Sequence, residues 1–127
     1  MLELTTGVNW LAVGLGTVLA FGLGMLWFSP RMFGKGWAQG SHNLQPPATL
    51  PLGAMLAQLI GIALMAWIIG VTAVANALAT ALLVILAIAV LQLAAGLFGQ
   101  KTRYAALVDA GYVVAMGALM IFAQAIL

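Results

Sequence analysis

The chain lacks cysteine and carries very little charge. None of its 127 residues is a cysteine, which excludes disulfides, thiolate catalysis and metal sites with cysteine ligands. Only 5% of the residues are charged, four basic and two acidic, whereas soluble domains carry roughly a quarter. So few charges cannot cover the surface of a water-soluble fold. The composition therefore predicts a membrane protein.

Groups that could perform chemistry are equally scarce. The single histidine, His42, has no acidic residue or second histidine nearby, so we expect neither a metal nor another cofactor. Ser29 has no paired base to make it a nucleophile. The two acids, Glu3 and Asp109, are expected near opposite faces of a membrane and cannot act as a catalytic pair. We therefore predict no catalytic residues and no enzyme.

Apolar residues make up most of what is present. They account for 65% of the chain, and the mean hydropathy is +1.20. Four apolar runs are each long enough to cross a hydrocarbon core, which takes about 20 residues. The predicted fold is all-α, a four-helix bundle in one transmembrane domain covering residues 1–127. The spans are expected at about 7–28, 51–71, 77–98 and 104–127.

The stretch between the first two spans has the composition of a membrane-interface anchor. Its sequence, WFSPRMFGKGW, mixes aromatic and basic residues, which suits the border between hydrocarbon and water. Proline disfavours helix at the residue before it, so the first span should stop near Ser29. A short interfacial helix is expected at 31–38. The anchor residues are Trp27, Ser29, Pro30, Arg31, Phe33, Lys35 and Trp37.

The basic residues predict how the chain crosses the membrane. Arg31 and Lys35 follow the first span, and Lys101 and Arg103 follow the third. In a four-span chain both connections lie on one side, and the connection on the other side carries no charge. The positive-inside rule places the basic segments in the cytoplasm and both termini on the outer, periplasmic side of a bacterial inner membrane. Two short basic pairs do not form a nucleic-acid surface, so we expect no nucleic-acid partner.

Small residues recur every four positions in the first two spans. This spacing puts them on one helix face and lets another backbone approach closely. The stripes serve either as seams between copies or with a larger membrane complex, or as packing surfaces within one bundle. Both interpretations stay open from the sequence. The stripes are Gly16, Ala20 and Gly24 in the first span and Gly53, Ala57 and Gly61 in the second.

Asp109 is the only acid inside a predicted span, and its depth matches that of two glutamines, Gln58 and Gln92. With Tyr112 one turn further along, these residues form a predicted polar layer. In a structural interpretation Asp109 is neutralised by a basic neighbour. In a functional one Asp109 and Tyr112 bind a proton or cation. We prefer the first, because Asp109 is shallow enough to reach a basic partner. The expected partners are Arg31, Lys35 or Arg103.

Four motifs resemble one known family. They are NWLAV at 9–13, WFSP at 27–30, FGKGW at 33–37 and DAGYVV at 109–114. Together the motifs resemble the bacterial membrane proteins grouped as domain of unknown function 1761. The resemblance implies a small four-helix inner-membrane protein and attaches no activity to it.

Two functions are compatible with these observations. The first is a packing, scaffold or accessory protein whose helices associate with a second copy or with a larger membrane complex. The alternative is a small homo-oligomeric transporter or channel that uses Asp109 as its coupling or selectivity acid. We favour the first, because the second and third spans are almost without polar side chains and a conduction path needs several.

Overall fold

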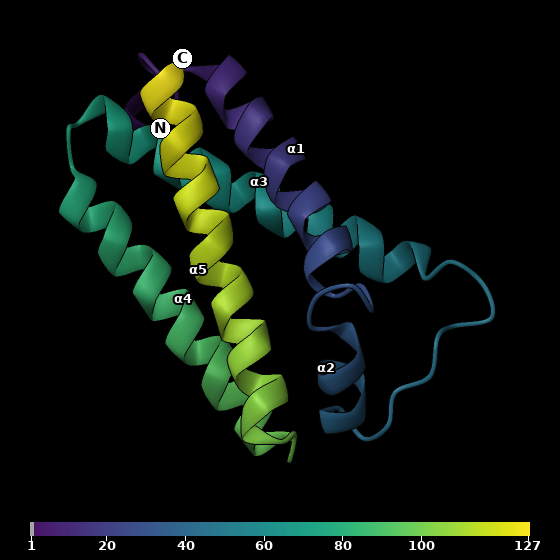
Figure 1. The fold of residues 1–127 in the computed structure, drawn as a ribbon. Helices are drawn as coiled ribbons and strands as arrows, with labels where there is room; N and C mark the ends of the chain where they lie inside the picture. The colour runs from purple at the N-terminus through teal and green to yellow at the C-terminus, as the bar shows by residue number, and fades with distance from the viewer. Residues whose placement is uncertain (1) are drawn as a thin grey trace.

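The computed structural model describes residues 2–127, and this part of the chain is entirely helical apart from its connections. Four of its helices are long and apolar enough to cross a membrane, which makes this a multi-pass membrane protein. A short helix follows the first span (Figure 1). The predicted fold class is thus confirmed. The elements are η1 Leu2–Leu4, α1 Trp10–Trp27, α2 Gly34–Gly40, α3 Leu52–Val74, α4 Leu78–Phe98 and α5 Arg103–Ile126.

Local side-chain contacts set both ends of α1. The Asn9 side chain accepts a hydrogen bond from Ala12 N at 3.1 Å, so the helix begins at Trp10 and not at residue 7. At the other end Ser29 Oγ donates to Leu26 O at 2.6 Å, directly before Pro30. A cap and a proline therefore delimit the first span.

Two further elements differ in extent from the prediction. The interfacial helix α2 covers Gly34–Gly40 in place of 31–38, because 30–33 form turns after the proline. The second span runs beyond residue 71 to Val74. Its helix continues through Thr72, whose hydroxyl is buried and donates to Ile69 O at 2.7 Å.

Helix α5 forms the centre of the bundle. It packs against α1, α2, α3 and α4, and in Figure 1 it lies between α1 and α4, with α3 crossing behind. Over the most apolar 18-residue stretch of α5, 56% of the residues are buried, whereas the corresponding stretches of the other spans are 22–28% buried. The outer faces of α1, α3 and α4 therefore face lipid. The core residues of α5 include Ala110, Tyr112, Val113, Met116 and Met120.

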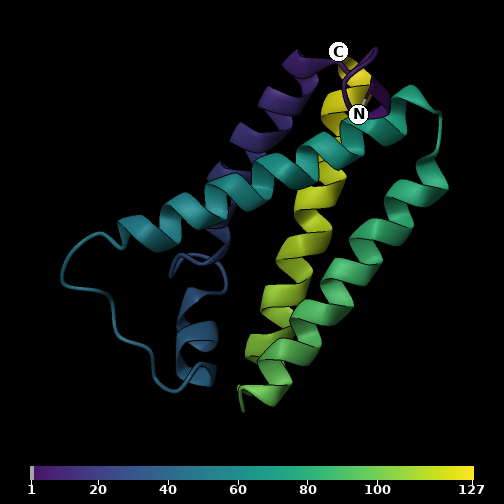
Figure 2. The ribbon, with the colours of Figure 1, turned by 180° about the vertical axis from the view of Figure 1, so that it is seen from behind.

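The two halves of α3 have different surroundings. Its buried residues begin at Ile62 and continue to Thr72. Residues 52–61 are exposed apart from Met55, which is half-buried. Figure 2 shows this first half extending away from the other spans towards the long connection that precedes it.

The two predicted small-residue stripes also lie in different places. The stripe of α1 faces α5, where a Cβ on Gly16 would lie 3.4 Å from Met120 Cα and one on Gly24 only 2.5 Å from Tyr112 Oη. The stripe of α3 is exposed, and a Cβ on Gly53 or Gly61 would have no neighbour within 4 Å. One stripe packs inside the bundle and the other has no partner among residues 2–127.

The bundle has two distinct ends. The short helix η1 and the C-terminus lie at one end, which we call the terminal end (Figure 1). The other end holds α2 and the α4–α5 turn at 99–102, and we call it the basic end because Arg31, Lys35, Lys101 and Arg103 belong to it.

Candidate functional site

The candidate site is built around Asp109, which is 7% exposed on α5. Lys101 Nζ donates to its Oδ2 at 2.7 Å. Trp37 Nε1 donates to its Oδ1 at 2.9 Å. Both carboxylate oxygens are therefore engaged, one by a charge and one by an indole from α2. We call Trp37, Lys101 and Asp109 the Asp109 cluster.

The predicted partners of Asp109 were wrong, for reasons of helix geometry. Arg103 precedes Asp109 by six residues, which turns it roughly 240° around α5. On α2, Lys35 lies two residues from Trp37 and so points to the opposite side when Trp37 faces Asp109. Arg31 is exposed in the turns before α2. None of the three predicted residues is the ion-pair partner.

Lys101 reaches Asp109 because of how α5 begins. Thr102 caps the helix, and its side chain accepts from Ala105 N at 3.2 Å. Seven residues, or about two turns, separate Thr102 from Asp109, so both lie on one face. Lys101 comes directly before the cap and extends along this face. Its Nζ also lies 5.4 Å from the centroid of the Trp37 ring, which adds a cation–π contact.

Further contacts join the two connections at the basic end. Thr102 N donates to Gly40 O at 3.0 Å, which links the α4–α5 turn to the end of α2. His42 Nε2 is hydrogen-bonded to Gly99 O at 2.7 Å. A Cβ on Gly36 would lie 2.5 Å from the Tyr104 ring, so α2 packs closely on α5. The two connections therefore form one unit, although about 60 residues separate them in the chain.

Aromatic side chains continue this unit into the bundle. Trp27 Nε1 donates to Val108 O at 3.0 Å, and Tyr112 Oη donates to Ala20 O at 2.7 Å. The Phe28 ring lies between Trp37 and Tyr112, with centroid distances of 4.8 and 5.3 Å. The second half of α1 is thus tied to α5 by two hydrogen bonds, and Phe28, directly after α1, packs on the Trp37 ring of α2.

The other members of the predicted polar layer do not bind Asp109 in the part of the chain described. The Tyr112 hydroxyl donates its hydrogen bond to Ala20 O of α1 and not to the Asp109 carboxylate. Gln58 is exposed and lies beside the Tyr112 hydroxyl. Gln92 is on the exposed side of α4. Within residues 2–127, the side chains that bind the Asp109 carboxylate are those of Lys101 and Trp37.

Sequence reasoning missed Trp37 and Lys101 as partners of Asp109. A signal for Trp37 was present, because the pattern placed it opposite Arg31 and Lys35, on the side of α2 that turns inward. The cap at Thr102 was a signal for Lys101. Using either one required knowing that α2 packs on α5.

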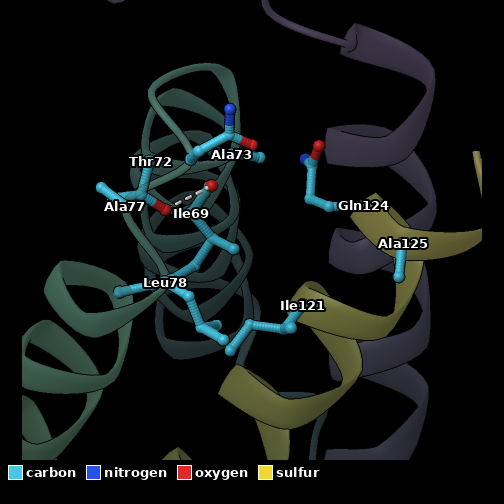
Figure 3. A pocket seen from close by; sticks show the side chains of 10 residues that line it. Ile69, Thr72, Ala73, Ala77, Leu78, Ile121, Gln124 and Ala125 are labelled. Carbon is cyan, nitrogen blue, oxygen red and sulfur yellow. Dashed lines mark hydrogen bonds between the residues drawn. The ribbon is translucent and has the colours of Figure 1, made fainter.

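A cavity of about 310 Å³ lies at the terminal end, between the α3–α4 turn and α5. Figure 3 shows Gln124 extending towards it from α5, while the Thr72 hydroxyl is turned to Ile69 O. None of its ten lining residues is charged. The cavity has carboxamides and a hydroxyl for hydrogen bonding, but no acid or base for proton transfer.

No curated protein and no solved structure matches the chain. A family model described as "Protein of unknown function (DUF1761)" matches residues 11–123. The match covers most of the chain, with nearly all of each long helix and the whole Asp109 cluster. This protein therefore belongs to the DUF1761 family.

Proposed function

We propose that this protein is a non-enzymatic packing, scaffold or accessory protein of the bacterial inner membrane. The observation that carries the proposal is the neutralised state of Asp109, whose two oxygens are both occupied from within the chain. An acid that transfers protons or cations needs a free position for them. Here the only acid inside a span joins three segments of its own protein.

The energetics favour a structural role for this acid. An unpaired charge within a membrane is costly, and removing one member of a buried pair leaves the other without compensation. Pairing with Lys101 lowers this cost, and the Trp37 indole satisfies the second oxygen. The cluster thereby ties α2 and the α4–α5 turn to the central helix.

The unpartnered side of α3 supports association with a second copy or a larger complex. Gly53, Ala57 and Gly61 are exposed on one face of its first half. Small residues on an exposed helix face let the backbone of a second helix approach closely in a membrane. A rigid basic end together with this open face suits a protein that holds other helices.

The alternative is a small homo-oligomeric transporter or channel in which Asp109 is the coupling acid. One observation favours it: the Lys101 side chain is 26% exposed, so the ion pair borders the surface. A proton or cation arriving there could compete with Lys101 for the carboxylate. A pathway would then need a second copy to complete it.

Asp109→Asn distinguishes the two functions, and Glu3→Gln is its matched control because the chain has only these two acids. Each purified protein is reconstituted in liposomes for proton and cation flux, and its thermal stability is measured. Scaffolding predicts no flux in any protein and a lower melting temperature for Asp109→Asn alone. Flux that Asp109→Asn abolishes at unchanged stability would overturn it in favour of transport.

The proposed topology places the basic end in the cytoplasm and both termini in the periplasm. Because the chain has no cysteine, single cysteines report their side without background. We expect Leu127→Cys in intact cells to react with a membrane-impermeant maleimide and Gln100→Cys to react only after the membrane is opened. The reverse pattern would overturn the topology.

A further inference from the structure

An open groove of about 400 Å³ lies at the basic end, between α2 and the start of α5. The glycines of α2 bring the two helices close together. A Cβ on Gly40 would collide with Thr102 Oγ1, and one on Gly36 would collide with the Tyr104 ring. The groove therefore depends on both glycines. Its lining residues are Gly36, Gln39, Gly40, Thr102 and Tyr104.

The polar side chains of this groove can all donate hydrogen bonds. Gln39 has a carboxamide, and Tyr104 is half-exposed with its phenol. Thr102 Oγ1 accepts from Ala105 N, which leaves the hydroxyl proton for another acceptor. There is no carboxylate among the lining residues. Such a set of donors suits an anion.

Two cations flank the groove. Lys35 lies one helical turn before Gln39 on α2, and Arg103 stands between Thr102 and Tyr104 in the chain; both are exposed. Within residues 2–127 the ion pair present is Lys101 with Asp109, so neither flanking cation has an acidic partner there. Positive charge at the groove is therefore not compensated by the protein.

We propose that this groove binds the phosphate of an anionic phospholipid headgroup. A lipid fits better than a free anion because apolar side chains at the same end are open to the bilayer. Phe98, at the end of α4, is 90% exposed, and Met32, before α2, is 42% exposed. Donors and cations at the same end of the bundle as exposed apolar surface match the two parts of a phospholipid. This inference is independent of the proposed function, because it holds for a scaffold or a transporter.

Native mass spectrometry of the whole protein in neutral detergent tests the proposal. The protein is titrated with phosphatidylglycerol or with phosphatidylcholine of the same acyl chains. We expect phosphatidylglycerol to bind more tightly. Lys35→Gln and Arg103→Gln should each weaken its binding roughly fivefold, which is the effect of about one interfacial charge. The matched control Arg31→Gln, outside α2, should change binding less than twofold.

A charge placed inside the groove gives a second test. Gln39→Glu keeps the size of the side chain and adds a negative charge to the lining, so phosphatidylglycerol binding should fall at least as much as in Lys35→Gln. All of these side chains are exposed, so melting temperatures in lipid-free detergent should be unchanged.

Three outcomes would overturn the proposal. Equal binding of the two lipids would remove the role of the phosphate charge. An equal loss in Arg31→Gln would indicate diffuse surface charge in place of the groove. Displacement of the lipid by millimolar inorganic phosphate would make the groove a site for the free anion.

Discussion

The two ends of the bundle are held together in different ways. At the basic end the Asp109 cluster, the Trp27 indole and the Tyr112 hydroxyl tie α1, α2 and the α4–α5 turn to α5. At the terminal end Trp67 donates to Leu4 O at 2.6 Å and packs against Trp10 at 5.5 Å. A cavity of about 310 Å³ separates the α3–α4 turn from α5 there.

This difference shows what polar contacts add to an apolar bundle. Apolar packing in lipid has little directional preference, because lipid tails are as apolar as the helix faces. Directed hydrogen bonds at the basic end select one rotation of α2 against α5. The terminal end lacks such a cluster in the described chain and tolerates a gap. The same type of substitution should therefore cost more at the basic end.

The largest effect is expected when the lysine of the cluster is removed. Lys101→Met leaves the Asp109 carboxylate with the Trp37 indole as its hydrogen-bond donor and no counter-ion. We expect the free energy of unfolding to fall by about 2–3 kcal/mol, below the usual range for fully buried pairs because Lys101 is partly exposed. Unfolding by sodium dodecyl sulfate in neutral detergent measures it. Lys35→Met is the control and should stay within about 0.5 kcal/mol of wild type; an equal loss in both would contradict the role of the cluster.

A matched pair of alanines compares packing at the two ends. Ala106 is fully buried at the basic end. It packs tightly on α4, because a Cβ added to Gly96 would lie 3.0 Å from the Cβ of Ala106. We expect Ala106→Leu to destabilise by about 2 kcal/mol through overpacking. Ala73 lines the cavity at the terminal end and is exposed, so Ala73→Leu should be neutral or stabilise by up to about 0.5 kcal/mol. The same unfolding titration measures both, and similar losses would show that the two ends are packed alike.

A smaller loss of stability than that of Lys101→Met or Ala106→Leu is expected when one hydroxyl group is removed. Tyr112→Phe keeps the ring contacts with Phe28 and removes the hydrogen bond to Ala20 O. We expect a loss of about 1 kcal/mol, the size of one such bond in a protein interior. Tyr104→Phe, at a half-exposed position, should have no measurable effect in lipid-free detergent. If both variants matched wild type, the link between α1 and α5 would rest on packing alone.

Much of the fold could be predicted because its signals are local. Hydropathy over about 20 residues is enough to find a span, and α4 lies within one residue of its predicted limits at 77–98. Pro30 stops the first span close to where it was expected. The misplaced limits lie at the start of α1, at α2 and at the end of α3. The first two are set by the Asn9 cap and by the turns after Pro30, which hydropathy does not detect.

The candidate site could be predicted only in part. Asp109 stood out because an acid in an apolar run is rare, but its partners depend on how α2 is rotated against α5. The sequence by itself determined the four spans, the short helix after the first and the two basic connections, since each follows from neighbouring residues. Only the tertiary structure decided that Lys101 and Trp37 bind the carboxylate and that Arg103 and Lys35 have no acidic partner within residues 2–127. The reason is that hydrophobicity places a helix in the membrane without fixing its rotation, and the rotation decides which side chains meet.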